Sequence, residues 1–104
     1  MKNIARSFVR YVRNDNSLKT LLMTHLIIIV IFAFIYKAID MNNVEAFNNE
    51  KEMTLFDCLY FSVVTHTTVG YGDIYPVSNL ARACMMIQVM TVFYFAFMEI
   101  NDFI

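Results

Sequence analysis

One stretch decides how this chain folds: residues 65–73 read Thr65-His66-Thr67-Thr68-Val69-Gly70-Tyr71-Gly72-Asp73. Both glycines of the 104-residue chain lie in it, and the one proline follows shortly afterwards, at Pro76. Glycine adopts positive φ at little cost. The backbone freedom of the chain is therefore concentrated here, and the surrounding sequence indicates the use that is made of it.

Two long apolar segments flank this stretch, because residues 20–36 and 83–98 carry no formal charge. About 17–20 apolar residues cross a bilayer, and Lys or Arg at the ends can reach the headgroups. We therefore expect transmembrane helices over 18–37 and 79–101. A cleaved signal peptide is the alternative for the first segment, but the run is longer than the usual apolar region of about 7–15 residues and no small-x-small cleavage pattern follows it.

The composition agrees with a small membrane protein. The chain is 59% hydrophobic and 16% charged, whereas soluble domains average about 45–50% and about 25%. This argues against a soluble enzyme and a disordered chain, and two cysteines are too few for a secreted disulfide scaffold. A net charge of -1 provides no basic field for binding nucleic acid.

The distribution of Lys and Arg predicts the orientation. Residues 1–20 contain five of them and residues 37–82 contain three, so the positive-inside rule places both termini in the cytoplasm and 37–82 outside. Within 1–14 the basic side chains share one helical face and the apolar ones the other. We expect an interfacial amphipathic helix on anionic lipid; the alternative is a frayed basic tail that only sets the topology.

The segment between the spans has two parts. Residues 38–53 are rich in Asn, Asp and Glu, and we expect a solvated extracellular loop. Residues 54–66 are apolar but too short to span, which in a membrane protein suggests a re-entrant pore helix. Thr54 can cap this helix, with Asp57 at its third position completing a capping box.

Residues 67–73 then form a non-helical loop at membrane depth, where backbone must be buried in protein or line a water-filled path. One short chain cannot bury it, so we expect several copies around it. Positive φ at both glycines would turn successive carbonyls to one side, and four such loops would stack rings of oxygens that replace the hydration shell of K⁺. We assign the ion sites to Thr68, Val69, Gly70, Tyr71 and Gly72, with the Val69 and Tyr71 side chains packed behind them. K⁺ is then the permeant ligand, and no cofactor is expected.

Thr68-Val-Gly-Tyr-Gly72 followed by Asp73 resembles the signature of potassium channels, and the similarity is specific over 56–76. With Thr65-His66 before the loop, residues 20–104 resemble the miniature potassium channels of large algal viruses. The resemblance implies an all-α membrane protein: a homotetramer of two transmembrane helices with a re-entrant pore helix and a selectivity-filter loop. It also implies K⁺-selective conduction, in a host cell membrane or the internal membrane of a virion.

The sequence departs from that family at several positions. Many potassium channels carry a Glu where Val64 stands, bonded to the residue at position 73, and a hinge glycine where Val92 stands. We therefore expect an unpartnered Asp73 and no hinge bending, and a poorly selective cation pore is one alternative. A small membrane anchor or interaction protein is another, although it has no need of two glycines in register. We also expect no cytoplasmic ligand domain, since the chain ends soon after the second span. The pore mouth and its support are assigned to Asp73, Thr67, His66 and Val64.

The register of the second span places one stripe on the pore, where a hydrophobic constriction would gate by dewetting; the alternative is a pore held open at that level. The stripe consists of Phe93, Ala96, Ile100 and Ile104. We interpret His66 as a hydrogen-bonded structural histidine, with pH sensing and a metal site with Cys58 as alternatives. We expect His25 to hydrogen-bond the neighbouring helix. Cys58 and Cys84 are expected as buried thiols, with a disulfide as the alternative.

Overall fold

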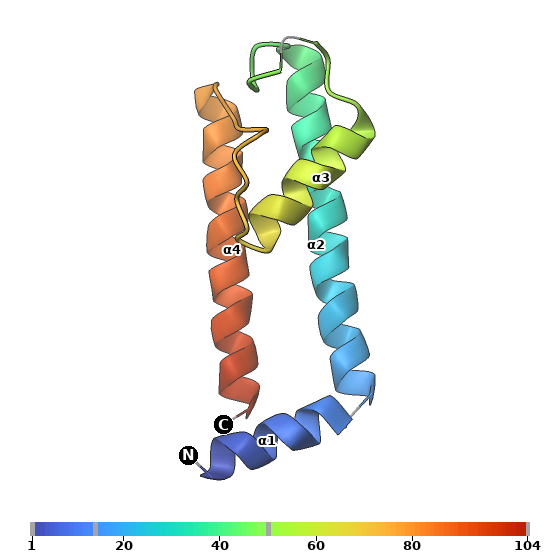
Figure 1. The fold of residues 1–104 in the computed structure, drawn as a ribbon, viewed down its shortest axis with the longest axis vertical. Coiled ribbons are helices and arrows are strands. Elements are labelled where there is room, and N and C mark those ends of the chain that lie inside the picture. Colours follow the sequence, from blue (N-terminus) through green and yellow to red (C-terminus); the bar gives the residue numbers. More distant parts are fainter. Residues whose placement is uncertain (1, 14, 50, 104) are drawn as a thin grey trace.

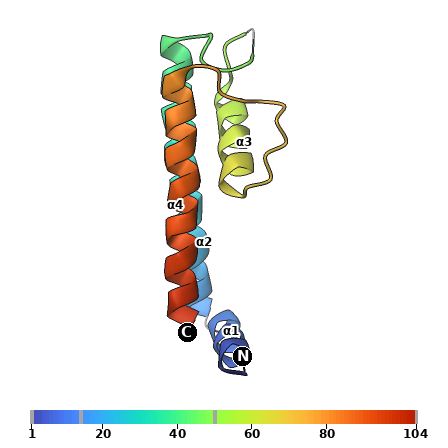
Figure 2. The same ribbon diagram turned by 90° about the vertical axis from the view of Figure 1, so that its left-hand side faces the viewer.

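The computed structural model describes residues 2–13, 15–49 and 51–103, and four helices account for most of them. They are α1 (Lys2–Arg13), α2 (Asp15–Asn42), α3 (Leu55–His66) and α4 (Asn79–Phe103). The long helices α2 and α4 run in opposite directions along a molecule of 51 × 21 × 18 Å. The short helix α3 lies against one side of the pair, and α1 crosses beneath one end of it (Figures 1 and 2). We call the α1 end inner and the opposite end outer.

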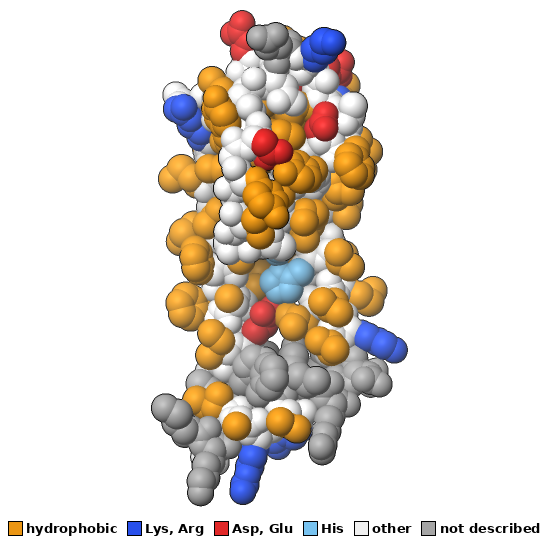
Figure 3. Space-filling model, viewed as in Figure 1, with side chains coloured by type: hydrophobic (Ala, Val, Ile, Leu, Met, Phe, Trp, Pro, Cys, Tyr) orange, Lys and Arg blue, Asp and Glu red, His pale blue; other side chains and the backbone are white. Residues whose placement is uncertain are grey.

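Two helices are long and apolar enough to cross a membrane, over Leu18–Asn42 and Asn79–Asn101. Neither contains Gly or Pro, so nothing in their sequence interrupts the hydrogen-bond ladder. Their large apolar side chains point outward, as Phe34, Met90 and Phe97 do, and they cover the flanks of the molecule in Figure 3. Apolar surface of this extent needs a partner other than water.

The first long helix exceeds the expected boundaries of 18–37 at both ends. It begins at Asp15, because Asp, Asn and Ser are well suited to the first turn of a helix. It continues to Asn42, and Asp40 is buried rather than solvated. The Asp40 carboxylate accepts the Met53 N–H at 2.9 Å, while Lys37 binds the Met53 carbonyl. The helix continues because its last turns hold the returning chain. The last helix likewise runs to Phe103, two residues beyond 101.

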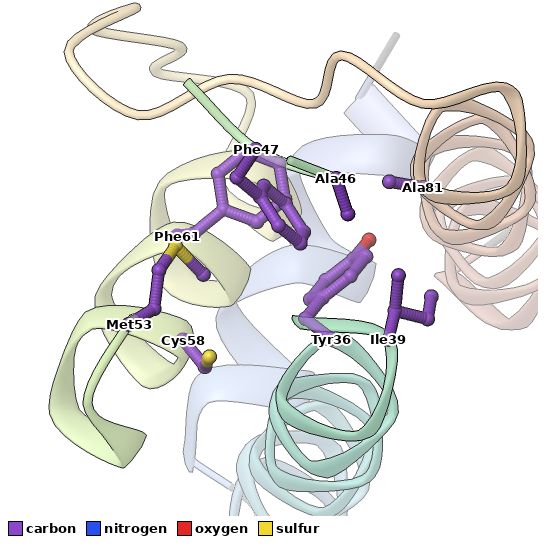
Figure 4. Packing of buried hydrophobic residues seen from close by; sticks show 8 residues of the cluster. All are labelled: Tyr36, Ile39, Ala46, Phe47, Met53, Cys58, Phe61 and Ala81. Atoms are coloured by element: carbon purple, nitrogen blue, oxygen red, sulfur yellow. The ribbon is translucent and has the colours of Figure 1, made fainter. Parts of the chain in front are cut away.

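The core lies at the outer end and corrects the expectation of a solvated loop over 38–53. The aromatic rings of Tyr36, Phe47 and Phe61 pack edge to face, with centroids 4.9 to 5.9 Å apart. Phe47 and Met53 lie among polar residues in the sequence, so the composition of 38–53 does not indicate that they are buried. The cluster joins α2, the loop, α3 and the start of α4 (Figure 4); its buried members are Tyr36, Ile39, Ala46, Phe47, Met53, Cys58, Phe61 and Ala81. Cys58 is buried, Cys84 is half-buried and both are free thiols, so the alternative of a disulfide is wrong.

A buried polar contact fastens the three apolar helices together. Gln88 of α4 is fully buried; its Oε1 accepts the Tyr36 hydroxyl at 2.6 Å, and its Nε2 donates to the Ser62 carbonyl at 3.2 Å. The Ser62 hydroxyl in turn donates to the Ile29 carbonyl at 2.8 Å. Buried polar groups that lose their partner are costly, so this network fixes one arrangement of the helices.

Replacing Tyr36 with Phe removes one hydroxyl and leaves the Gln88 amide oxygen unpaired. We expect a loss of about 1–3 kcal/mol in unfolding free energy, the cost of a buried unsatisfied acceptor. Denaturant titration of the purified protein in detergent measures it. Tyr94→Phe makes the same chemical change at an exposed position of α4 and should cost far less. Equal effects of the two variants would contradict the role given to Gln88.

Candidate functional site

The site is built on α3, whose start and end the sequence specifies. Thr54 is the N-cap: its hydroxyl accepts the Asp57 N–H at 3.1 Å, and the Asp57 carboxylate accepts the Thr54 N–H at 3.0 Å. The predicted capping box is thus confirmed. The helix descends from the outer end and stops at His66, part of the way along α2 and α4, and the chain then returns to the outer end on the side of α3 that faces away from the two long helices (Figures 1 and 2). This is a re-entrant path.

The returning loop alternates between two backbone conformations. Thr68, Gly70 and Gly72 have φ of 62°, 58° and 82°, while the residues between them have negative φ. Positive φ at both glycines agrees with the sequence-based expectation, and at Thr68 it was not expected. A non-glycine residue in this region costs about 1–2 kcal/mol. Alternation of this kind turns successive carbonyls to the same side of the chain.

The carbonyls of this loop have no hydrogen-bond donor among the residues that the structure describes. Val69 and Gly70 donate their N–H groups to the Val64 carbonyl at 3.1 and 3.3 Å, which fixes the loop to the end of α3. In the described part of the chain, by contrast, no hydrogen bond is accepted by a backbone carbonyl of residues 68–72. Backbone acceptors at membrane depth must be satisfied by something.

The loop is also uncovered on its other faces. The side chains of Val69 and Tyr71 are 52% and 72% exposed. A Cβ built on Gly70 or Gly72 would meet no atom within 4 Å. The packing that we expected behind the loop is therefore not supplied by the chain itself. Thr67 is exposed as well, with its hydroxyl donating to the Val63 carbonyl at 2.8 Å, and Val64 supports the loop through its backbone.

Asp73, expected to lack a partner because Val64 replaces a Glu, has one. Its Oδ2 accepts the Tyr60 hydroxyl at 2.8 Å, and this hydrogen bond raises the pKa of Tyr60 above its usual value. Tyr60 lies one helical turn before Val64, so both positions of α3 face the loop. Sequence reasoning missed Tyr60, although the spacing of four residues could have indicated it.

A chain of hydrogen bonds runs inward from the end of α3. His66 is buried, and its Nε2 lies 2.8 Å from Nδ1 of His25 on α2. Nε2 of His25 lies 2.6 Å from a carboxylate oxygen of Glu99 on α4. His25 thus bonds the neighbouring helix, and His66 is hydrogen-bonded, as expected. Among the described residues there is no group of three or more His, Cys, Asp or Glu side chains that could hold a metal ion.

Donor counting assigns the protons in this chain. The Ser62 carbonyl can only accept, so Gln88 directs Nε2 towards it; Nε2 also lies 3.0 Å from the Ser62 hydroxyl and 3.5 Å from His66 Nδ1, and an amide nitrogen does not accept. His66 Nδ1 then accepts and Nε2 donates to His25, which donates from its own Nε2 to Glu99. In this assignment every ring nitrogen has a hydrogen-bond partner. One additional proton must break a link.

The stripe on α4 is partly described. Phe93 and Ile100 are 49% and 50% exposed and lie two turns apart on one helical face, with the half-buried Ala96 between them. This face is available to other chains. Ile104 lies outside the described residues.

Acid should weaken the junction of the three helices. Burial lowers the pKa of His66, His25 lowers it further, and Glu99 opposes the shift. The unfolded chain therefore binds this proton more readily than the folded one, and stability falls as the pH drops below about 6.5. We expect the melting temperature in detergent to decrease from pH 7.5 to 5.5, and nitrogen NMR to show a neutral His66 with its proton on Nε2 at pH 7.5.

His66→Gln is the matched control, because it keeps a hydrogen-bonding side chain that does not titrate. Its melting temperature should change less with pH than that of the wild type. An imidazolium signal from His66 at pH 7.5, or equal pH dependence in both proteins, would contradict the assignment.

Comparison with known proteins assigns the chain to a family. An ion-channel family matches residues 24–104. The chain is similar to potassium channel protein kcv of Paramecium bursaria Chlorella virus 1, with 41% identity over 69% of this chain and 80% of the relative. It is also similar to potassium channel K2 of Plasmodium falciparum (isolate 3D7), with 38% identity over 46% of this chain and 3% of that much longer protein. No solved structure matches the chain. The match covers most of the sequence, including most of the first span, the whole re-entrant loop and the second span: the chain belongs to the ion-channel family, as a membrane protein with two spans and not an enzyme.

Proposed function

We propose that this protein is a potassium-selective channel whose ion sites are the carbonyl oxygens of residues 68–72 and the Thr68 hydroxyl. The observation that carries the proposal is the alternation of φ at Thr68, Gly70 and Gly72, in a loop whose carbonyls no described group satisfies. Rings of carbonyl oxygens replace the hydration shell of K⁺, and adjacent rings allow ions to displace one another. The potassium-channel names of both relatives support the choice of ion.

The channel is a homotetramer in this proposal. One copy leaves the loop uncovered, with exposed Val69 and Tyr71 side chains and an exposed apolar face on α4. Copies around a fourfold axis would bring the carbonyls into rings and give the two side chains neighbours. The end of α3 would then direct its partial negative charge towards the ion path. The stripe of Phe93, Ala96 and Ile100 would line the inner part of the pore, where a hydrophobic constriction can gate by dewetting.

The membrane placement follows from charge and shape. The start of α1 and the end of α4 both lie at the inner end of the molecule (Figure 1), which supports two cytoplasmic termini. The helix α1 crosses that end, with Arg6 and Arg10 exposed, and these side chains would contact anionic headgroups. The relative from a Chlorella virus supports a host membrane or a virion membrane as the location.

The hydrogen bond to Asp73 disfavours the alternative of a poorly selective cation pore. That alternative rested on an unpartnered Asp73, whereas Tyr60 occupies the carboxylate at 2.8 Å. A paired Asp73 favours a filter that keeps its shape.

Replacing Gly70 with Ala tests the backbone geometry directly. The new Cβ would meet no atom of its own chain, so the cost arises from φ of +58°, a conformation that disfavours L-residues by about 1–2 kcal/mol in each of the copies around the pore. We expect K⁺ current in planar bilayers to be abolished or to lose its selectivity. D-Alanine at position 70, introduced by chemical synthesis, favours positive φ and should retain selective current. Selective current from the L-alanine variant would contradict the carbonyl-ring site.

Tyr60→Phe tests the support of the filter from α3. It removes the hydroxyl that binds Asp73 and keeps the aromatic ring. We expect tetramers of normal stability with a lower permeability ratio of K⁺ to Na⁺ than the wild type, and a milder defect than Gly70→Ala. Tyr94→Phe, on the exposed face of α4, should leave the ratio unchanged. A wild-type ratio in Tyr60→Phe would show that the Asp73 carboxylate needs no partner.

A further inference from the structure

Asn48, in the loop that we expected to be merely solvated, uses its whole carboxamide on the segment after the filter. Its Nδ2 donates to the Asp73 carbonyl at 2.8 Å, and its Oδ1 accepts the Tyr75 N–H at 2.8 Å. Its backbone N–H also donates to the Tyr75 carbonyl at 3.1 Å. Three hydrogen bonds thus join one loop residue to two residues that lie 25 and 27 positions further along the chain.

The two residues before Asn48 are anchored in the core. Its neighbour Phe47 is buried in the aromatic cluster with Tyr36 and Phe61 and pairs with Pro76 across the two segments. The carbonyl of Ala46, which is fully buried, accepts the N–H groups of residues 77 and 78 at 2.7 and 3.1 Å. The backbone directly before Asn48 is therefore anchored in the core.

Asp73 is the residue through which this contact would reach the ion path. It directly follows Gly72, which has φ of 82°. Gly72 has no side chain that could contact the surrounding residues and fix its position. Tyr60 holds the Asp73 carboxylate, and Asn48 holds the Asp73 carbonyl. The residue that follows the filter is thus held by a hydrogen bond from α3 on one side and by a hydrogen bond from the outer loop, through Asn48, on the other.

We propose that Asn48 is a positioning residue for potassium selectivity, which fixes the outermost carbonyls of the filter by holding Asp73 and Tyr75. The inference rests on the proposed function of residues 68–72 as ion sites. Asn48 does not touch the ion; it acts through the backbone of the residues that follow Gly72. The task requires a short neutral side chain that donates at one end and accepts at the other, which Asn provides and neither Asp nor Ala does.

Four variants of adjacent asparagines test the role. Asn48→Ala removes both side-chain bonds, and Asn48→Asp keeps an acceptor for the Tyr75 N–H but loses the donor to the Asp73 carbonyl. Asn49→Ala and Asn49→Asp make the same changes, including the added charge, one residue further along. The permeability ratio of K⁺ to Na⁺ is measured in planar bilayers, and the tetramer band in SDS and the melting temperature report assembly.

We expect both Asn48 variants to have a lower ratio than the matching Asn49 variants, by roughly two- to tenfold for each bond lost, with tetramers still formed. If Asn48→Ala fails to assemble, the comparison of Asn48→Asp with Asn49→Asp decides. Ratios equal to those of the Asn49 variants, or a lowered melting temperature with unchanged selectivity, would overturn the proposal and leave the filter assignment intact. A wild type that does not select K⁺ would overturn the filter assignment and the proposal with it.

Discussion

A backbone carbonyl inside a membrane needs a partner, and the rest of this structure depends on how that need is met. Residues 68–72 are placed part of the way along two membrane-length helices, outside any helix, with carbonyls that accept no hydrogen bond in the described part of the chain. In hydrocarbon such an arrangement would cost several kcal/mol for each group. It is tolerable where cations pass, because the carbonyl oxygens then coordinate a dehydrated ion.

The remaining elements hold this loop in position. The capping box sets the start of α3, and the Val64 carbonyl at its far end receives the first N–H groups of the loop. The Gln88 network fixes α3 against the two spans, and the His66 chain continues that junction towards the inner end. At the outer end, Asp73 is held from two sides. Polar contacts from α3 and from the outer loop thus meet at the two ends of residues 68–72.

Much of this could be predicted from the sequence, and the limits have physical causes. The two spans, the cap at Thr54 and positive φ at both glycines follow from local rules that short patterns reveal. The roles of Asp40, Phe47 and Asn48 do not, because each depends on a contact with a distant segment, and a polar composition gives the same expectation for a solvated loop as for an anchored one. The role of Tyr60 is not evident from the family pattern, which points only to the replaced position, Val64, whereas Tyr60 lies one turn earlier on the same face of α3.

The carbonyl rings of residues 68–72 are tested most directly by the reversal potential of the purified wild-type protein in a planar bilayer, with K⁺ on one side and Na⁺ on the other. We expect a reversal potential strongly displaced towards the K⁺ equilibrium potential, with currents that Ba²⁺ blocks. Clear unitary currents that reverse near zero would contradict it, because they would mean that the carbonyls of residues 68–72 do not form the rings on which selection of K⁺ depends.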